Sequence, residues 1–172
     1  AQVRLGSGRE SVYLVPLLQW LLTEGAGQRA LVILPTEQDV ATVMRHAQAL
    51  AEAVEIPVHA IGRDVDTSDV SASLSLGAVE VLAERGEAAS LDLRDYGFVV
   101  ADGAERFVES PWHGHLLQVR SYLRPARERR TMIIADKLGT PEQTLALDLA
   151  DAPTELYLEE EAEKGKHVPQ ST

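Results

Sequence analysis

The sequence contains no cysteine, which excludes disulfide bonds, thiolate metal sites and cysteine nucleophiles. No apolar run approaches the roughly 18 to 20 residues that a membrane-spanning helix needs. The first residues, AQVRLG, lack the apolar stretch and small-residue cleavage site of a secretion signal. We therefore expect a cytoplasmic location and no membrane partner.

Basic residues are in the minority, with 16 Lys and Arg against 27 Asp and Glu and a formal net charge of −11. Because nucleic-acid affinity comes largely from cations that neutralise phosphates, an acidic domain starts at a disadvantage for that role. Arginines are densest between Arg120 and Arg130. We interpret this run as the solvated end of a helix and a turn, with a local nucleic-acid patch as the alternative.

What is present is a chain of 172 residues, 45% of them hydrophobic, in which apolar strand patterns alternate with helical ones. Strands are expected at 2–5, 29–34, 58–61, 96–101, 131–135 and 155–158, and helices at 9–23, 38–53, 76–84, 114–123 and 140–149. We expect Thr140 to cap the last of these helices. This alternation predicts an α/β fold with a mainly parallel sheet covered by helices on both faces. In such sheets ligands bind at the carboxyl ends of the strands, so the residues that follow each strand are the candidates for function.

Those strand-end residues carry a family resemblance. AQVRLGSGRE at 1–10 is similar to AQAPTGSGKT, the phosphate-binding loop of DEAD-box RNA helicases, and LPTEQ at 34–38 resembles PTREL. LGA at 76–78 matches the end of TPGR, VVADGAERF at 99–107 resembles the strand and DEAD motif, and RPARERRTMIIAD at 124–136 is similar to RPxRQTLLFSAT. Because these matches occur in the family's order, the chain resembles the N-terminal RecA-like (P-loop NTPase type) domain of such helicases.

The resemblance implies a RecA-like lobe over residues 1–158 and a charged linker over 159–172 that leads toward a second lobe. It also places the start of the chain inside the phosphate-loop motif, so most of the family's first strand is missing. A sheet without that strand would expose an apolar edge. We interpret the sequence as an excerpt of a longer polypeptide.

On the nucleotide side, the resemblance assigns cofactor binding, with ATP and Mg²⁺ as the cofactors, to Gly6, Ser7, Gly8, Arg9 and Glu10. Arg9 takes the position of the family's lysine, and its planar fork replaces a compact point charge. Glu10 takes the position of the hydroxyl that holds magnesium and brings a negative charge toward the nucleotide's own. We therefore expect nucleotide binding to be weak or absent.

In the second motif Asp102 matches the carboxylate that holds magnesium, and Glu105 retains the motif's last carboxylate. The resemblance gives both a catalytic role, which is vestigial here because Gly103 stands where the family has the glutamate that activates water. Loss of a positioned base reduces the rate by about 100- to 10,000-fold. Asp136 stands where the third motif has its final hydroxyl. These replacements together predict that ATP is not hydrolysed.

For RNA, the resemblance points to Pro35, Thr36, Gly62, Arg63 and Gly77, with Ser75 as a further candidate. Glu37 replaces the arginine of PTREL, so a phosphate-attracting charge becomes a repelling one. We expect weak RNA binding and, as the main partner, a protein or a second RecA-like lobe.

Three functional hypotheses follow from these motifs. The first is a non-hydrolysing scaffold or interaction module in RNA metabolism, the second a divergent but active ATP-dependent RNA helicase, and the third a nucleotide sensor without turnover. Other candidate sites are set aside. His113 and His115, at spacing i, i+2, do not share a helix face and are expected at a loop or helix start. His46 and His59 are isolated and interpreted as structural, and Trp20 as a core residue.

Overall fold

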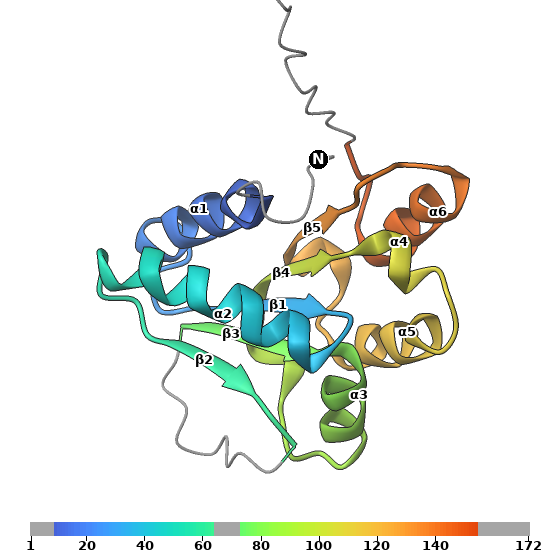
Figure 1. The fold of residues 1–172 in the computed structure, drawn as a ribbon, viewed down its shortest axis with the longest axis horizontal. Helices are drawn as coiled ribbons and strands as arrows, with labels where there is room; N and C mark the ends of the chain where they lie inside the picture. The colour runs from blue at the N-terminus through green and yellow to red at the C-terminus, as the bar shows by residue number, and fades with distance from the viewer. Residues whose placement is uncertain (1–8, 64–72, 155–172) are drawn as a thin grey trace, which may run out of the picture.

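The computed structural model describes residues 9–63 and 73–154, which form a five-stranded sheet in the order β2-β3-β1-β4-β5 with every pair parallel (Figure 1). The strands are β1 (Arg29–Leu34), β2 (Val58–Ile61), β3 (Leu74–Ala78), β4 (Tyr96–Asp102) and β5 (Arg130–Ile134). The α-helices are α1 (Arg9–Leu22), α2 (Glu37–Glu52), α3 (Val79–Glu87), α4 (Ala104–Phe107), α5 (Trp112–Tyr122) and α6 (Thr140–Leu149). Short 3-10 helices cover Leu93–Asp95 and Ala126–Glu128. The predicted α/β class is confirmed.

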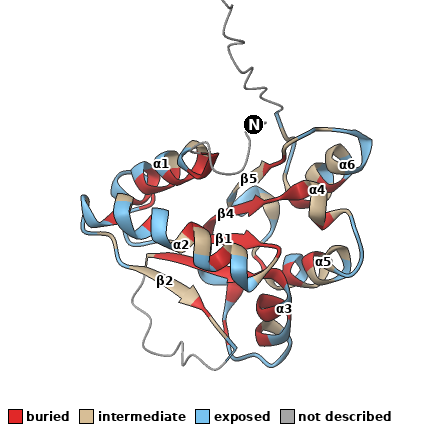
Figure 2. Cartoon of the chain, in the orientation of Figure 1, coloured by how far each residue is buried: buried red, intermediate tan, exposed pale blue. Residues whose placement is uncertain are grey.

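The central strands are apolar along their whole length because both faces of the sheet are covered. Every residue of β4 is buried, and so is every residue of β1 after Arg29 (Figure 2). Helices α1 and α2 pack against each other beside one face, while α3 and α5 pack together beside the other (Figure 1). Trp20 is buried and meets the ring of Phe98 edge-on, with centroids 5.4 Å apart, which confirms it as a core residue.

The main error of the sequence prediction is at residues 74–78, which form the buried strand β3 rather than leading into a helix at 76. The run LSLGA is short and continues directly into the helix, so its apolar residues fit a helix pattern as well as a strand. Between β1 and β2 its Gly77 lies under Leu82, whose Cδ2 would be only 2.7 Å from an added Cβ. Close packing of helix on strand therefore requires glycine here.

Smaller differences occur at helix starts. The four-residue helix α4 was not predicted, since one turn is too short to show a periodic pattern. Helix α5 begins at Trp112 instead of 114. Gly139 is the N-cap of α6 and Thr140 its first residue, so Thr140 is not the cap that we expected. The strands predicted at 2–5 and 155–158 and the linker at 159–172 lie outside the described residues.

Within the described residues β5 is an edge of the sheet, and an apolar hollow of about 840 Å³ runs beside it between α1 and α6. Its walls include Val12 and Pro16 of α1, Met132 and Ile133 of β5, and Leu147 of α6. None of the described helices is both long and apolar enough to cross a membrane.

Candidate functional site

Four charged side chains from separate parts of the chain converge at the carboxyl end of the sheet. Arg9 is the first residue of α1, Asp102 the last residue of β4, Glu105 belongs to α4, and Asp136 follows β5. The parallel topology explains the convergence, because strand ends and the starts of the following helices share one edge. The structure thus brings together Arg9, Asp102 and Glu105, as their strand-end positions predicted.

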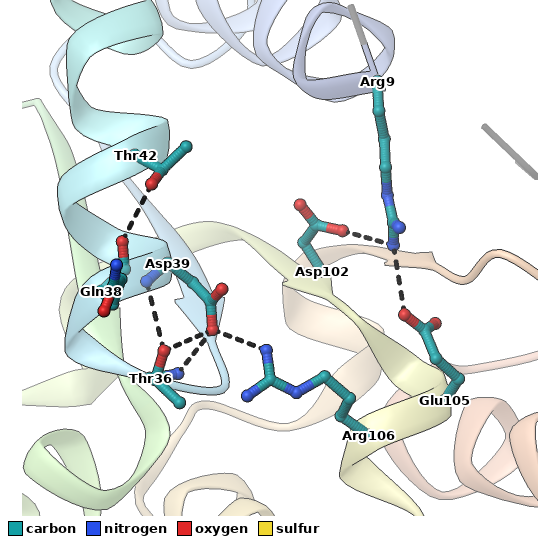
Figure 3. Close-up of polar contacts among 8 residues, drawn as sticks. All are labelled: Arg9, Thr36, Gln38, Asp39, Thr42, Asp102, Glu105 and Arg106. Carbon is teal, nitrogen blue, oxygen red and sulfur yellow. Dashed lines mark hydrogen bonds and ion pairs between the residues drawn. The ribbon is translucent and has the colours of Figure 1, made fainter. Parts of the chain in front are cut away.

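The Arg9 guanidinium lies at the centre of this cluster (Figure 3). Its Nη2 is 2.7 Å from Oδ1 of Asp102 and 3.9 Å from Oε1 of Glu105, and its Nη1 donates a hydrogen bond to Asp136. The Asp102 contact is an ion pair without hydrogen-bond alignment, since neither atom has a hydrogen-bond partner. Arg9 is 2% exposed, so its charge is almost fully withdrawn from water.

The Asp102 carboxylate lies in a poorly solvated position. Burial raises its pKa above the ordinary 3.8, an effect that Glu105 adds to and that Arg9 and Tyr13 oppose. Tyr13 of α1 is fully buried beside this carboxylate, and burial together with the Asp102 charge raises the pKa of its phenol. Tyr13 therefore remains a neutral hydroxyl, and Asp102 depends on Arg9 for its charge balance.

Gly103, the residue between β4 and α4, has a backbone that other residues rarely adopt. Its φ is +97° and its ψ +43°, and an added Cβ would lie 3.1 Å from Cγ of Pro35. The Gly103 N–H donates to the carbonyl of Ile134 at 3.0 Å, which ties the end of β4 to β5. A side chain at this position would therefore meet both backbone strain and the buried Pro35.

Glu10, the second residue of α1, is buried at 4% exposure. Its Oε2 lies 3.5 Å from Nδ1 of His46, a residue of α2 whose side chain is 55% exposed. A carboxylate in the first turn of a helix is favoured by the helix dipole. His46, which we had interpreted as isolated, is the neighbour of Glu10 across the two helices.

Thr36, predicted to contact RNA, caps helix α2 in a reciprocal arrangement with Asp39. The Thr36 hydroxyl donates to Oδ2 of Asp39 at 2.6 Å, and the Asp39 N–H donates to the hydroxyl at 3.2 Å. Oδ2 also accepts from Nη1 of Arg106 at 2.8 Å (Figure 3). The Arg106 guanidinium lies over the ring of Trp112. These contacts already engage the Thr36 hydroxyl and fix Arg106.

Arg63 lies on the surface among three carboxylates. Its Nε is 3.3 Å from Glu37, its Nη2 2.9 Å from Glu80, and its Nη1 forms hydrogen bonds to Glu84. Hydrogen bonds to Glu84 and then to Glu37 raise the pKa of Arg63. This exposed guanidinium is therefore already paired with carboxylates from α2 and α3.

The remaining residues predicted to contact RNA are placed differently. The Gly62 carbonyl accepts from Nη1 of Arg85 at 2.9 Å. Gly77 is buried inside β3, and Ser75 in the same strand is 0% exposed. The prediction that Ser75 contacts a phosphate backbone is wrong, because the strand that the sequence analysis missed places it in the interior.

A small hollow of about 120 Å³ opens between Arg9 and Arg106 at this edge of the sheet. Its walls are Arg9, Glu10, Leu34, Pro35, Asp39, Thr42, Val43, Asp102, Gly103, Glu105 and Arg106.

In residues 9–63 and 73–154 no group of three or more His, Asp and Glu is arranged to hold a metal ion. His113 lies at the start of α5 with Nδ1 3.2 Å from the Phe107 carbonyl, as a helix-start residue. Gly6, Ser7 and Gly8 lie outside the described residues.

Sequence reasoning missed Tyr13 and the partners of Arg63. It counted Asp136 among the strand-end candidates and as a lost hydroxyl, but it did not predict the contact of Asp136 with Arg9. Tyr13, four residues after Arg9, lies one helical turn from it, which was a signal. Nothing in the sequence singles out Glu80 and Glu84 as partners of Arg63.

Comparison with known proteins places this arrangement in a family. The sequence profile of the DEAD/DEAH box helicases matches residues 1–135. Two fungal relatives are 24% identical over 147 residues, or 81% of this chain: the ATP-dependent rRNA helicases rrp-3 of Neurospora crassa and RRP3 of Pyricularia oryzae. The chain spans only 28% and 27% of their respective lengths.

Solved helicase structures share the fold. A variant of S. cerevisiae Dbp5, bound to a Gle1 variant and IP6, superposes with a TM-score of 0.78 at 15% identity, over 92% of this chain and 41% of Dbp5. A hypothetical ATP-dependent RNA helicase from Sulfolobus tokodaii gives 0.71 at 16% identity, over 86% of this chain and 44% of its own. With its five parallel strands and the strand-end cluster at Arg9 and Asp102, the chain belongs to the DEAD/DEAH box helicase family, as its N-terminal RecA-like domain.

Proposed function

We propose that this RecA-like domain acts in RNA metabolism as a scaffold or interaction module that does not hydrolyse ATP, and that its location is cytoplasmic. The observation that carries the proposal is the buried Arg9, whose guanidinium contacts Asp102, Glu105 and Asp136. In this family the corresponding edge of the sheet receives ATP and Mg²⁺.

The residues at this edge do not fit a magnesium nucleotide. The carboxylate that the resemblance assigns to magnesium, Asp102, faces a cation of the chain itself at 2.7 Å. Glu10 supplies a buried carboxylate where the resemblance expects a neutral hydroxyl, close to where phosphate charge would lie. Arg9 opposes the metal ion and Glu10 opposes the phosphates, so weak or absent binding of a magnesium nucleotide is expected.

The missing base is a second support. Gly103 has no side chain to activate water, and its φ of +97° beside Pro35 disfavours any residue with a Cβ. Loss of a general base lowers the rate by about 100- to 10,000-fold. The absence of a general base at this position therefore fits both the residue type and the backbone conformation.

Weak RNA binding is supported by the contacts of Arg63 and Thr36. The guanidinium of Arg63 is surrounded by Glu37, Glu80 and Glu84, so this patch has more negative than positive charge. The Thr36 hydroxyl is already used in the cap of α2. A phosphate backbone would have to displace these contacts and approach three carboxylates, which favours a protein or a second lobe as the partner.

The proposal is tested by ATP turnover, with and without single-stranded RNA, on the 172-residue chain and on a version extended at both ends. We expect a rate equal to that of the Asp102→Ala variant under both conditions. RNA-stimulated turnover that Asp102→Ala abolishes would refute the proposal, because it requires a working magnesium carboxylate. Folding of each variant is checked by circular dichroism.

A divergent but active ATP-dependent RNA helicase is the alternative. It is favoured by the convergence of Arg9, Asp102 and Glu105 at the same strand ends as the family's motifs. Calorimetry separates the two, since this alternative requires binding heat with ATP and magnesium. Binding heat without turnover would instead indicate a nucleotide sensor.

A further inference from the structure

We propose that Arg9 is a built-in counter-ion of the Asp102, Glu105 and Asp136 carboxylates, and that by occupying their centre it excludes a divalent cation from this edge of the sheet. The inference rests on the proposed function and extends it, because it names the residue that keeps the site closed. With Arg9 as the counter-ion, the three carboxylates need no metal ion to be held together.

The charges of the cluster require an internal cation. The Asp102, Glu105 and Asp136 carboxylates all face the Arg9 guanidinium, and Asp102 and Arg9 are each less than a tenth exposed. A guanidinium spreads its charge over a planar fork, so its two terminal nitrogens reach different partners at once. Nη1 takes Asp136, and Nη2 faces both Asp102 and Glu105. A single lysine ammonium would not span the same set.

The position of Arg9 leaves it little freedom to withdraw. It is the first residue of α1, and its neighbour Tyr13 is packed at 0% exposure one turn later. The backbone N–H of Asp136 donates to Oε2 of Glu105 at 3.2 Å, which ties the Glu105 carboxylate to the segment that carries Asp136. At the centre of the cluster the Arg9–Asp102 pair is buried, while the Glu105 and Asp136 side chains are partly exposed.

A divalent cation and Arg9 compete for the same oxygens. Magnesium requires oxygen ligands at about 2.0–2.1 Å in octahedral geometry. The Asp102 oxygen that would serve it lies 2.7 Å from Nη2. No group of three acidic or histidine side chains in the described ranges has metal-binding geometry. The three carboxylates of this cluster each contact the guanidinium. Repulsion between Arg9 and the metal adds to this.

Removing the charge of Arg9 should convert the cluster into a cation site. The experiment uses the 172-residue chain with MgCl₂ or MnCl₂ alone as the probe, and compares wild type, Arg9→Gln and Arg9→Gln/Asp102→Asn by thermal unfolding. Bound Mn²⁺ is counted by electron paramagnetic resonance. Arg63→Gln is the matched control, since it removes an arginine that also faces three carboxylates, but on the surface.

We expect the Tm of wild type and of Arg63→Gln to be unchanged by millimolar magnesium, and neither to hold Mn²⁺ tightly. Arg9→Gln should lose roughly 10 °C without metal, since breaking a buried ion pair leaves uncompensated charge. It should recover about half of that loss in magnesium, because a ligand that binds only the folded state stabilises it. Adding Asp102→Asn should abolish the recovery and the bound Mn²⁺.

Two results would overturn the inference: tight Mn²⁺ binding by wild type, or an Arg9→Gln protein that folds and gains no cation. If Arg9→Gln does not fold, Arg9→Lys replaces it. An ammonium reaches fewer of the carboxylates, so Arg9→Lys should show a smaller Tm loss and a smaller magnesium recovery, and no recovery at all would contradict the inference. ATP turnover by wild type would refute the proposed function by itself, whereas a failed cation gain in a protein without turnover refutes only the role of Arg9.

Discussion

Two arginines of this domain, Arg9 and Arg63, each face three carboxylates, and their surroundings differ. Arg9 is 2% exposed and its partners come from β4, α4 and the segment after β5. The Arg63 side chain is 42% exposed and its partners are glutamates of α2 and α3. In the first cluster Arg9 and Asp102 have lost almost all contact with water and depend on one another, although Glu105 and Asp136 remain partly exposed, while in the second cluster water screens every charge. An arginine facing three carboxylates is therefore required for stability at Arg9, whereas at Arg63 it mainly changes the surface charge.

The largest effect on stability is expected from a substitution at Arg9. Arg9→Met keeps most of the volume and removes the charge, leaving Asp102, Glu105 and Asp136 without their cation. We expect the free energy of unfolding to fall by roughly 3–5 kcal/mol, as for other buried pairs with one partner removed. Urea unfolding followed by circular dichroism measures it. An unchanged midpoint would mean that the carboxylates reach water in the folded protein.

A second change acts on the backbone that supports the buried cluster. Gly103→Ala places a Cβ at φ +97°, 3.1 Å from Pro35, and it should destabilise the fold by about 1–3 kcal/mol. Gly114→Ala is the control, since no atom lies within 4 Å of an added Cβ there. Equal stability of the two variants would show that Gly103 is free to adopt another conformation.

The pH dependence of stability sharpens the role of burial. The pKa of Asp102 is raised in the folded state, so the folded protein holds this proton more tightly than the unfolded chain. The contribution of Asp102 therefore favours folding at low pH and declines as pH rises from its ordinary pKa of 3.8 through the raised one.

Asp102→Asn removes this term, so the difference in unfolding free energy between variant and wild type should shift in favour of the variant as pH rises through that window. Urea titrations across acidic pH values measure the difference. A difference that does not vary with pH would show that Arg9 offsets the burial completely.

The smallest effect is expected at Arg63. Arg63→Ala removes an exposed guanidinium, and salt already screens its contacts with Glu37 and Glu84. The Tm should move little, and less at high salt, whereas the patch becomes more negative and RNA retention in low-salt filter binding should fall further. A loss of stability comparable to that of Arg9→Met would contradict the distinction between the two clusters.

The alternation of strands and helices could be predicted from the sequence because the central strands are continuous apolar runs ended by turn residues. RALVIL is followed by Pro35, and YGFVVAD by Gly103. The short run LSLGA was not predicted as a strand, because β1, β2 and α3 bury it on every side and its residues show no periodic pattern. The convergence of Arg9 and Asp102 was predictable for the same reason as the fold, because both follow from parallel strand ends.

The residues that face one another across these elements were not predictable. Asp136 stands at a motif position and Tyr13 follows one, and only packing shows that both meet the site. Glu80 and Glu84 lie one helical turn apart on α3, where a surface role is the ordinary interpretation of such a pair. Their contact with Arg63 depends on where the segment that follows β2 lies relative to α3.

By itself the sequence determined the fold class, the family resemblance and the chemical groups at the strand ends, since these depend on local apolar patterns and on residue identity. Tertiary structure decided which of these groups are buried and which face water. It buried Arg9 together with Asp102, beside the partly exposed Glu105 and Asp136, and it left Arg63 among three carboxylates on the surface. The physical reason is desolvation, which acts on a charge only once other elements have covered it.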